Sequence, residues 1–458
     1  KYSDAVGTPN TFSDSTAGTS FGGVFTSVKQ IFTDEDGSKL PAFVTNSAYF
    51  QLFSSSVEMS QEMFGDFNGD GRSDILRITP AKEAWVWYSQ PGTFAGAYLW
   101  ATGVENPDQI KLGDVDGDGR TDLIVYRSNG FVNVYISTGS SFQLNSAYTT
   151  SGAGPVDNGA IVADVNGDGR SDLVQFPSSG GASVRLATGS NFAPAALWIS
   201  ATYTLFGSHT SIPYLGDING DGAADIIESK SFGVLQVWVS NRTSGFFIQS
   251  QTLQSSLPYN IFTLGKLPVQ FGDFNGDGLN DIVLCGSSGA EVYLSNGTTV
   301  VFSAPFALGA GLSTEVAGKG LTVKVGDFNG DGKADLYNLQ RITSGVFHTQ
   351  IRFSNGISFE PATELGGVLT ASSSVGILPA WTPDIDGDGR SDIAFPGVGA
   401  TASVIFVFVA NTPYPDLATK ITDGFGNYHE LSYLPMTDSN IYWQDSTTNY
   451  IGNDYRRF

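Results

Sequence analysis

Just over half of the acidic residues in this chain lie in a nine-residue pattern, Asp-x-(Asn/Asp)-Gly-Asp-Gly-x-x-Asp, that occurs seven times. Positions 1, 3, 5 and 9 carry side-chain oxygens, and position 7 can add its main-chain carbonyl. The glycines at positions 4 and 6 allow a tight turn in which alternate oxygens converge. Hard oxygen donors in a flexible loop favour Ca²⁺ over Zn²⁺, and Mg²⁺ is disfavoured because it demands strict octahedral geometry. The pattern therefore predicts seven calcium loops.

The predicted calcium ligands occupy positions 1, 3, 5, 7 and 9 of each copy, with position 7 acting through its carbonyl oxygen. They are Asp66, Asn68, Asp70, Arg72, Asp74, Asp114, Asp116, Asp118, Arg120, Asp122, Asp164, Asn166, Asp168, Arg170, Asp172, Asp217, Asn219, Asp221, Ala223, Asp225, Asp273, Asn275, Asp277, Leu279, Asp281, Asp327, Asn329, Asp331, Lys333, Asp335, Asp384, Asp386, Asp388, Arg390 and Asp392. We expect about seven structural Ca²⁺ ions. Extracellular calcium modules commonly bind the ion at about 10⁻⁴–10⁻³ M, so such loops fill outside a cell and empty in a cytosol. The sequence therefore favours a secreted, extracellular or cell-surface protein.

The composition of the 458-residue chain excludes several classes of partner. Its formal net charge of −22 and pI near 4.3 argue against nucleic acid and anionic membranes, because both require a basic surface. The loops hold 23 of the 45 acidic residues, and the remaining 22 balance the 23 basic ones. Cys285 is the only cysteine, so no intramolecular disulfide can form. No apolar run approaches the ~18 residues of a membrane-spanning helix.

The residues around each loop are repeated as well, and they indicate β-strands. A short apolar stretch such as 109–113 precedes the loop, and a β-branched run such as 122–126 follows it. After a Gly/Ser/Asn turn come two more stretches, for example 131–137 and 139–142. Alternating apolar residues and β-branched or aromatic side chains are typical of strands, and no segment shows a 3.6-residue apolar period. Four short strands in each unit of about 50 residues predict an all-β, seven-bladed β-propeller.

The ends of the chain depart from the repeat. The expected segments are 1–65, which closes the ring or forms a degenerate blade, the blades over 66–412, and 413–458. The last segment contains a predicted β-hairpin with a Gly/Asn turn over 421–433, followed by a polar and aromatic tail. The tail is a candidate linker.

Two arrangements of the first segment are open. We favour seven blades, with Thr19–Phe25 as a fourth strand that completes the last blade and closes the ring. The alternative is eight blades, in which residues 36–53 belong to a degenerate unit whose metal loop has decayed, because Phe32 and Leu40 stand where Asp is expected.

No constellation of catalytic residues emerges from the sequence. The three histidines, His209, His348 and His429, have no partner motif, and Cys285 follows an apolar strand, as an inert buried thiol does. The motifs of nucleophile elbows, zinc proteases and phosphate-binding loops are absent. We therefore predict that the chain is not an enzyme.

Aromatic residues recur in the third strand of the units, and we assign them to the core between blades. They are Trp87, Tyr135, Trp238, Tyr293, Phe353 and Phe408. Three tryptophans, Trp100, Trp198 and Trp443, lie outside that register and are candidates for exposed contacts. Of these, Trp100 and Trp198 are our speculative ligand-binding residues.

The seven units resemble the FG-GAP/VCBS repeat family, which is found in integrin α-chain propellers and many secreted bacterial proteins. The resemblance spans roughly residues 60–411 and implies a propeller in which the Asp and Asn residues of each loop bind calcium.

A second resemblance concerns 416–427 and 431–438, which are similar to the segment after the propeller in toxin-complex B components and related Rhs or plasmid-virulence-type proteins. It implies a propeller that docks on a partner and caps or gates a shell, although this chain lacks the Tyr-Asp repeats of that shell.

These observations together predict a non-enzymatic, secreted, calcium-binding β-propeller. We expect it to act as a protein-docking module of a toxin-complex or Rhs-like system, with a toxin-complex or cell-surface protein as its partner. The alternatives are a secreted adhesin or lectin that binds glycans, and a structural component of an extracellular assembly.

Overall fold

Strands are the only regular elements in the part of the chain that the structure describes. The computed structural model describes residues 48–53, 62–90, 93–104, 110–126, 131–150, 160–177, 180–200, 211–230, 234–242, 245–254, 269–286, 289–298, 300–303, 315–316, 319–343, 346–364, 369–370, 380–398, 403–410, 420–422 and 428–430. No helix long and apolar enough to cross a membrane occurs within these ranges. Thr19–Phe25 and Trp443 lie outside them.

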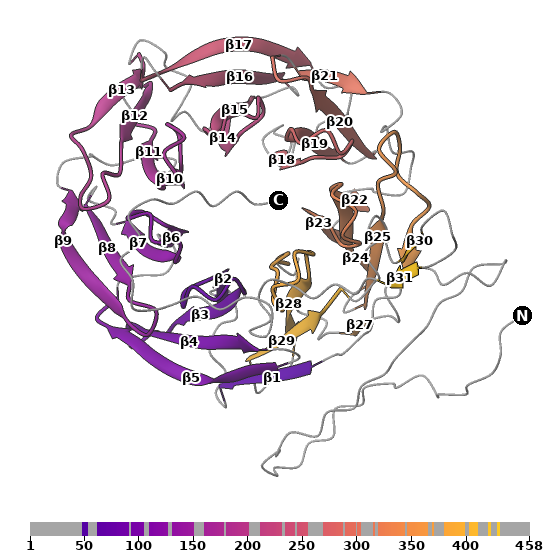
Figure 1. The fold of residues 1–458 in the computed structure, drawn as a ribbon, viewed down its shortest axis with the longest axis horizontal. Helices are drawn as coiled ribbons and strands as arrows, with labels where there is room; N and C mark the ends of the chain where they lie inside the picture. The colour runs from indigo at the N-terminus through magenta and orange to yellow at the C-terminus, as the bar shows by residue number, and fades with distance from the viewer. Residues whose placement is uncertain are drawn as a thin grey trace, which may run out of the picture.

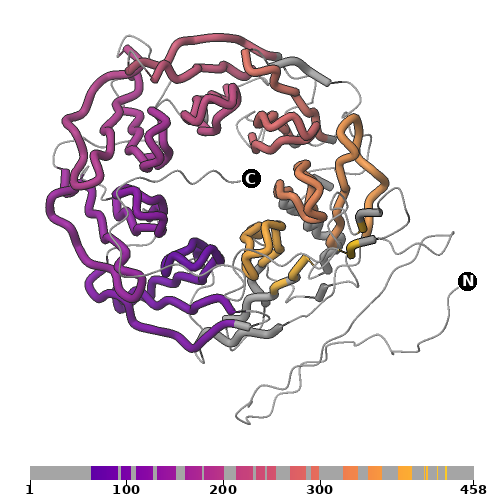
Figure 2. The backbone as a smooth tube through the Cα atoms, viewed as in Figure 1, coloured from indigo at the N-terminus to yellow at the C-terminus, as the bar shows by residue number. Residues whose placement is uncertain are grey.

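The strands form antiparallel sheets arranged around a central axis, as Figures 1 and 2 show. The first three blades consist of β2 (Glu62–Gly65), β3 (Asp74–Ile78), β4 (Glu83–Gln90) and β5 (Thr93–Thr102), then β6 (Ile110–Gly113), β7 (Asp122–Tyr126), β8 (Val132–Ser137) and β9 (Phe142–Thr150), then β10 (Ala160–Ala163), β11 (Asp172–Gln175), β12 (Ala182–Arg185) and β13 (Ala196–Ile199). Within each blade, strands that follow one another in sequence pair with one another. This order confirms the predicted all-β propeller.

The next three blades continue the same order around the ring. They consist of β14 (Ser211–Gly216), β15 (Asp225–Lys230), β16 (Val234–Asn241) and β17 (Phe246–Gln254), then β18 (Val269–Gly272), β19 (Asp281–Gly286), β20 (Gly289–Ser295) and β21 (Val300–Ser303), then β22 (Glu315–Val316), β23 (Lys319–Gly326), β24 (Asp335–Thr343), β25 (Val346–Arg352), β26 (Thr363–Glu364) and β27 (Leu369–Thr370). A separate antiparallel pair, β30 (Lys420–Thr422) and β31 (Tyr428–Glu430), lies within the segment where the sequence predicts a hairpin, and the turn between the two strands falls outside the described residues.

The predicted count of seven blades is wrong, and so is the alternative of eight. Six sheets in the described ranges have four or more strands, whereas the seventh loop belongs to a sheet of three, β1–β29–β28. Within the described residues, which begin again at 380, the inner strand of this sheet is represented by one bridge, between Trp381 and Ala394. The residue before the seventh loop is Pro383, which has no N–H and therefore accepts a bond from Asp392 without returning one. The residue in this place in the other six blades is Gly or Ala, each of which has an N–H. Proline therefore removes one of the two main-chain hydrogen bonds that this pair of residues can form.

The ring closes with a strand from the first segment, but at a different place from the predicted one. Strand β1 (Ala48–Phe53) pairs antiparallel with β29 (Ser403–Phe408), which in turn pairs with β28 (Ile393–Val398). Residues 48–53 are therefore the outer strand of the last sheet and no part of an eighth blade. The alternation of apolar side chains in Thr19–Phe25 and in 48–53 is similar, so periodicity alone does not distinguish the two segments.

Alternate residues of each second strand pack against opposite neighbouring blades. Between the first and second blades, Leu76 and Ile78 of β3 meet Leu123 and Val125 of β7, and all four side chains are buried. A strand directs successive side chains to opposite faces, so one apolar run supplies the core on both sides of its blade. This explains why the runs after the loops are continuously apolar rather than alternating with polar residues.

We expect Phe274→Ala to lower the free energy of unfolding by about 3–5 kcal/mol, because truncating a buried phenylalanine leaves a cavity. Phe274 is fully buried and its ring centroid lies 5.6 Å from that of Phe359. Urea unfolding at a fixed calcium concentration measures the change. The control is Ile357→Ala, at a side chain 71% exposed, which should shift stability by less than about 0.5 kcal/mol. A loss as small for Phe274→Ala would contradict this packing.

Candidate metal centres

Each acidic loop connects the first strand of its sheet, or the residual bridge in the seventh, to the second strand. The two glycines of all seven loops have positive φ angles, between 72° and 88°. Residues with a Cβ rarely adopt this left-handed conformation, so glycine is required at both positions. The structure thus confirms the tight turns that the spacing predicts.

The first aspartate of each loop organises the turn through main-chain hydrogen bonds. In the second loop, Asp114 Oδ1 accepts from the N–H groups of Gly117 (2.7 Å) and Asp118 (3.2 Å), and its Oδ2 accepts from Gly119 (2.8 Å). The same three bonds recur in the other six loops. A carboxylate has about four lone-pair sites, so these bonds leave capacity for a cation.

The last aspartate of each loop is completely buried and connects two parts of its blade. Asp122 Oδ2 accepts from the N–H of Val115 (3.0 Å) at position 2, and its Oδ1 accepts from the N–H of Ser137 (2.8 Å) at the end of β8. The equivalent pair of bonds occurs in all seven loops. Position 9 therefore fixes the loop to the third strand of the same blade.

Burial raises the pKa of these carboxyl groups, the neighbouring carboxylates raise it further, and the main-chain N–H bonds oppose the shift. The pKa of Asp122 and of Asp335 rises to about 8, and that of Asp281 to about 6. The pKa of Asp74, Asp172 and Asp225 rises to about 7, and that of Asp392 lies well above its usual range. A cation close to such a group favours its charged form.

Two of the loops bring three carboxylates together, Asp114 with Asp116 and Asp122, and Asp384 with Asp386 and Asp388. In each group the oxygens lie within 4.8 Å of one another. Burial, followed by the charges of Asp118 and Asp114, raises the pKa of Asp116 to about 6. The other five loops have Asn at position 3, which replaces a carboxylate by a neutral oxygen donor. An all-oxygen donor set of this kind fits Ca²⁺.

The side chain at position 7 has a function that the sequence did not indicate. In five loops it is Arg or Lys and pairs with the carboxylate at position 5, as Arg72 does with Asp70 (3.2 Å). In three of these loops the stem of the basic side chain also lies against the preceding loop: a Cβ on Gly69 would be 3.1 Å from Arg120 Cγ, and Gly117 and Gly276 face Arg170 and Lys333 in the same way. The Arg or Lys side chain at position 7 therefore offsets carboxylate charge in its own loop. In these three loops it also covers a glycine of the preceding loop.

The fourth loop has Ala223 at position 7, and an arginine from another part of the sequence takes over part of this function. Arg242, which follows β16, donates from Nε to the carbonyl of Asn166 (3.0 Å) and from Nη2 to that of Gly167 (3.0 Å). Its Nη1 donates to the carbonyl of Asp221. Arg242 thus joins the third loop to the fourth.

The loops also bond directly to one another around the ring. The residue at position 8 of each loop donates to the position-1 carbonyl of the preceding loop. These bonds run from Ser73 to Asp384, Thr121 to Asp66, Ser171 to Asp114, Ala224 to Asp164, Asn280 to Asp217, Ala334 to Asp273, and Ser391 to Asp327, at 2.6–2.9 Å. Six come from the main-chain N–H, and the one from Asn280 comes from its side-chain amide. All seven loops are therefore connected in a closed ring.

Close approach of the loops requires glycine immediately before most of them. A Cβ on Gly113 would lie 2.7 Å from both Ser171 Oγ and Val162 Cγ1, closer than real contacts allow. We therefore expect Gly113→Ala to separate the second and third loops and to lower the melting temperature by several degrees. Gly96→Ala, where a Cβ would meet nothing within 4 Å, is the matched control and should leave the melting temperature nearly unchanged. Equal melting temperatures for the two variants would contradict the proposed contact between loops.

A recurring serine, whose function the sequence did not indicate, connects neighbouring blades. Ser137 Oγ donates to the carbonyl of Phe67 (2.6 Å) in the preceding loop, while its N–H binds Asp122 of its own blade. The same hydroxyl contact comes from Ser89, Ser240, Ser295 and Ser354. In the third blade the equivalent residue is Ala187, and Tyr148 Oη donates instead to the carbonyl of Val115 (3.2 Å). The signal in the sequence was a serine 14 or 15 residues after position 9 in four blades and 19 residues after it in the sixth.

We expect Ser137→Ala to lower the free energy of unfolding by about 1–3 kcal/mol, because the buried carbonyl of Phe67 loses its donor. Thermal and urea unfolding of the variant measure the loss. Ser140→Ala, at an exposed turn position two residues beyond Thr138, provides the control. If both variants were as stable as the parent chain, the serine contact would contribute nothing to the ring.

The prediction that Trp100 and Trp198 are exposed contacts is wrong. Both are buried, at 3% and 4% exposure. Trp100 packs on Phe142 of the next blade, with ring centroids 4.8 Å apart, and Trp198 packs on Phe247 in the same way, at 5.3 Å. The third-strand aromatics Trp87, Tyr135, Trp238, Tyr293 and Phe353 are buried as predicted. Both sets of aromatic residues therefore belong to the core between blades.

Of the three histidines and the cysteine, only His429 has a side chain that the structure describes. His429 lies exposed on β31, and His348 is on β25. His209 and the side chain of Cys285 fall outside the description.

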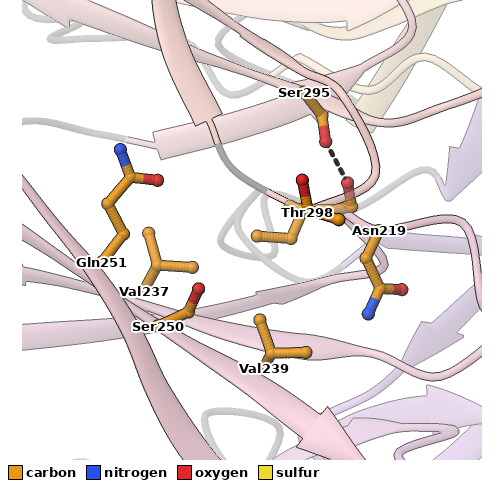
Figure 3. A pocket seen from close by; sticks show the side chains of 8 residues that line it. Asn219, Val237, Val239, Ser250, Gln251, Ser295 and Thr298 are labelled. Carbon is orange, nitrogen blue, oxygen red and sulfur yellow. Dashed lines mark hydrogen bonds between the residues drawn. The ribbon is translucent and has the colours of Figure 1, made fainter.

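A small pocket lies between the fourth and fifth blades, next to the fourth acidic loop (Figure 3). Asn219 of that loop, Gln251 of β17 and Thr298 line it, together with Val237 and Val239 of β16. It offers about 10 Å³ to the centres of water molecules, which is room for about one ordered water. A sugar ring does not fit in this space.

The repeat is recognised by comparison with known families. A family described as FG-GAP-like repeat matches residues 66–125, 114–175, 164–228 and 273–337, which together contain the first six acidic loops. The chain is a β-propeller built from FG-GAP-like repeats. No curated protein sequence is significantly similar to this FG-GAP-repeat chain.

Several solved structures are similar to this FG-GAP-repeat chain. One is a lectin from Agrocybe aegerita that recognises non-reducing terminal N-acetylglucosamine; it is 23% identical, with 69% of this chain and 81% of the lectin covered and a TM-score of 0.55. Another is the Tc holotoxin pore of Photorhabdus luminescens, which is 16% identical, with 83% of this chain and 20% of that chain covered and a TM-score of 0.42. At these identities the likeness concerns the fold alone.

Proposed function

We propose that this chain is a calcium-braced, non-catalytic β-propeller that acts outside the cell by binding another protein. The observation that carries the proposal is the closed ring of seven loops, each with oxygen donors at the same spacing. Asp114 and Asp122 show how the first and last carboxylates of a loop are held by main-chain N–H groups, so the donors are ordered before an ion arrives. Preordered oxygen donors lower the cost of binding a hard cation.

The function of the ions in this proposal is structural. About seven Ca²⁺ would be held by the residues at positions 1, 3, 5 and 9 and by the carbonyl at position 7. The ion supplies positive charge that offsets the mutual repulsion of the carboxylates. A chain with a single cysteine gains from the loops the bracing that disulfides give to many secreted proteins. An extracellular setting follows because weak calcium sites are filled only there.

The proposed partner is a protein of a toxin-complex or Rhs-like system. Support comes from the sequence of 416–438, which is similar to the segment after the propeller in toxin-complex B components. Strands β30 and β31 show that part of this segment forms an antiparallel pair of strands beyond the propeller.

Glycan binding is the weaker alternative for this chain. The residues expected to stack on sugars, Trp100 and Trp198, are buried between blades. The pocket beside Asn219 holds about one water. The lectin from Agrocybe aegerita shares the fold at 23% identity, which leaves its ligand a property of that protein. A structural component of an extracellular assembly is the other alternative, and concentration-dependent self-association of the full chain would support it.

Native mass spectrometry of Asp114→Ala tests the proposed function. We expect the parent chain to carry about seven Ca²⁺ and the variant one fewer, with a free energy of unfolding lower by about 1–3 kcal/mol because three main-chain donors lose their acceptor. Glu360→Ala removes an exposed acidic residue outside the loops and should retain the full calcium count. An unchanged count in Asp114→Ala would show that this loop does not hold the ion, and no calcium on the parent chain would contradict the whole proposal.

A further inference from the structure

The fifth and sixth acidic loops have the same predicted side-chain ligands but differ in charge at position 7. Their sequences are DFNGDGLND and DFNGDGKAD, so positions 1, 3, 5 and 9 are identical. Position 7 is Leu279 in the fifth loop and Lys333 in the sixth. Position 8 is Asn280 or Ala334, and both residues donate to the position-1 carbonyl of the preceding loop. The two loops therefore allow the effect of a positive charge at position 7 to be isolated.

Leu279 and Lys333 occupy equivalent places against the loop that precedes their own. A Cβ on Gly220, at position 4 of the fourth loop, would lie 2.5 Å from Leu279 Cδ2. A Cβ on Gly276, at position 4 of the fifth loop, would lie 3.2 Å from Lys333 Cγ. Leucine thus keeps the packing of the longer side chain and omits its charge.

The carboxylate at position 5 has a different neighbour in each of the two loops. In the sixth loop, Asp331 Oδ2 lies 3.2 Å from the ammonium nitrogen of Lys333. In the fifth loop, Asp277 Oδ2 accepts instead from the neutral amide Nδ2 of Asn275, at 2.9 Å. The sixth loop therefore has an internal counter-ion on one of its predicted ligands, and the fifth loop has a neutral donor in that place.

A basic side chain paired with position 5 has opposite effects on the empty loop and on the loop that holds an ion. In the empty loop it offsets the mutual repulsion of the carboxylates. With calcium in the loop, the two positive charges repel each other and compete for the same carboxylate oxygen. Calcium affinity depends on the charge of the ligand set. Lysine at position 7 therefore stabilises the empty loop and weakens ion binding, whereas leucine does neither.

We propose that the side chain at position 7 sets the calcium affinity of each loop, so that the fifth loop fills before the sixth as calcium rises and loses its order before it as calcium falls. The proposal rests on the calcium binding of the proposed function and deepens it by naming the residue that regulates each site. The fourth loop, with Ala223 at position 7, is an intermediate case, because Arg242 brings its guanidinium to the carbonyl of Asp221 and not to the carboxylate.

Hydrogen-exchange mass spectrometry of the full chain over a calcium titration that starts in EDTA tests this inference. Peptides from 269–286 and 319–343 report on the fifth and sixth loops separately. We expect the fifth loop to become protected at about tenfold lower free calcium than the sixth. Leu279→Lys should raise the calcium midpoint of the fifth loop about tenfold, and Lys333→Leu should lower that of the sixth by a similar factor. Each substitution places at position 7 a side chain that the equivalent place in the other loop already accommodates.

The same variants should change the empty loops in the opposite direction. In EDTA, Leu279→Lys should slow exchange at the amides of Gly276 and Gly278, which bind the Asp273 carboxylate at 2.6 and 2.7 Å. A change in packing alone would move the empty and the calcium-bound loop in the same direction. Leu144→Lys adds the same charge on β9, at a side chain 54% exposed, and as the control should leave both loops unchanged.

Two results would overturn the inference. The fifth and sixth loops of the parent chain could fill at the same calcium concentration, or the substitutions at position 7 could leave both midpoints where they are. Counting the bound ions by native mass spectrometry on the same samples keeps these failures distinct from failure of the proposed function. About seven Ca²⁺ with equal midpoints would refute only the role of position 7, whereas a chain without calcium would refute both.

Discussion

The contact between position 8 of one loop and the position-1 carbonyl of the preceding loop is the interaction on which the rest of the ring depends. It occurs at every junction, including the one from Ser73 to Asp384 that connects the first loop with the last. The ring of loops is therefore closed even where the seventh sheet lacks a full inner strand. Glycine precedes five of the loops, and a Cβ on Gly113 would lie 2.7 Å from Ser171 Oγ of the next loop. The third and seventh loops make the same contact with Ala163 and Pro383 in this place.

The same residues that connect the loops also carry the charge that would drive the loops apart. Position 1 offers its carbonyl to the next loop and its carboxylate to its own turn, as Asp114 does. Position 9 is buried and holds both the turn and the third strand. A cation at the centre of such a loop would strengthen both contacts by compensating the carboxylates. Metal binding in the loops, as proposed, would therefore be coupled to ring closure through shared residues.

Much of the fold and of the candidate site could be predicted from the sequence, because both are repeated. The spacing of Asp and Gly gave the turns, and the apolar runs gave the strands and the inter-blade core. Pairing between distant segments could not be predicted, since 48–53 and Thr19–Phe25 have similar alternation and only tertiary contacts choose between them. The burial of Trp100 could not be predicted, because the aromatic positions shared by the third strands do not show how the outer strand packs. Trp100 lies on the outer strand β5 and packs on Phe142 of the next blade. Pro383, before the seventh loop, accepts a main-chain bond from Asp392 and has no N–H to return one, a local effect that the repeat pattern does not predict.

Hydrogen exchange at the position-8 amides, measured in saturating calcium and again in EDTA, tests most directly whether metal in the loops holds the ring together. The amides of Thr121, Ser171 and Ser391 report on three junctions, and that of Ser73 reports on the closing one. Our account predicts that calcium slows exchange at all of them together. Equal exchange rates with and without calcium would contradict it, because the ring would then be closed by packing and hydrogen bonds alone.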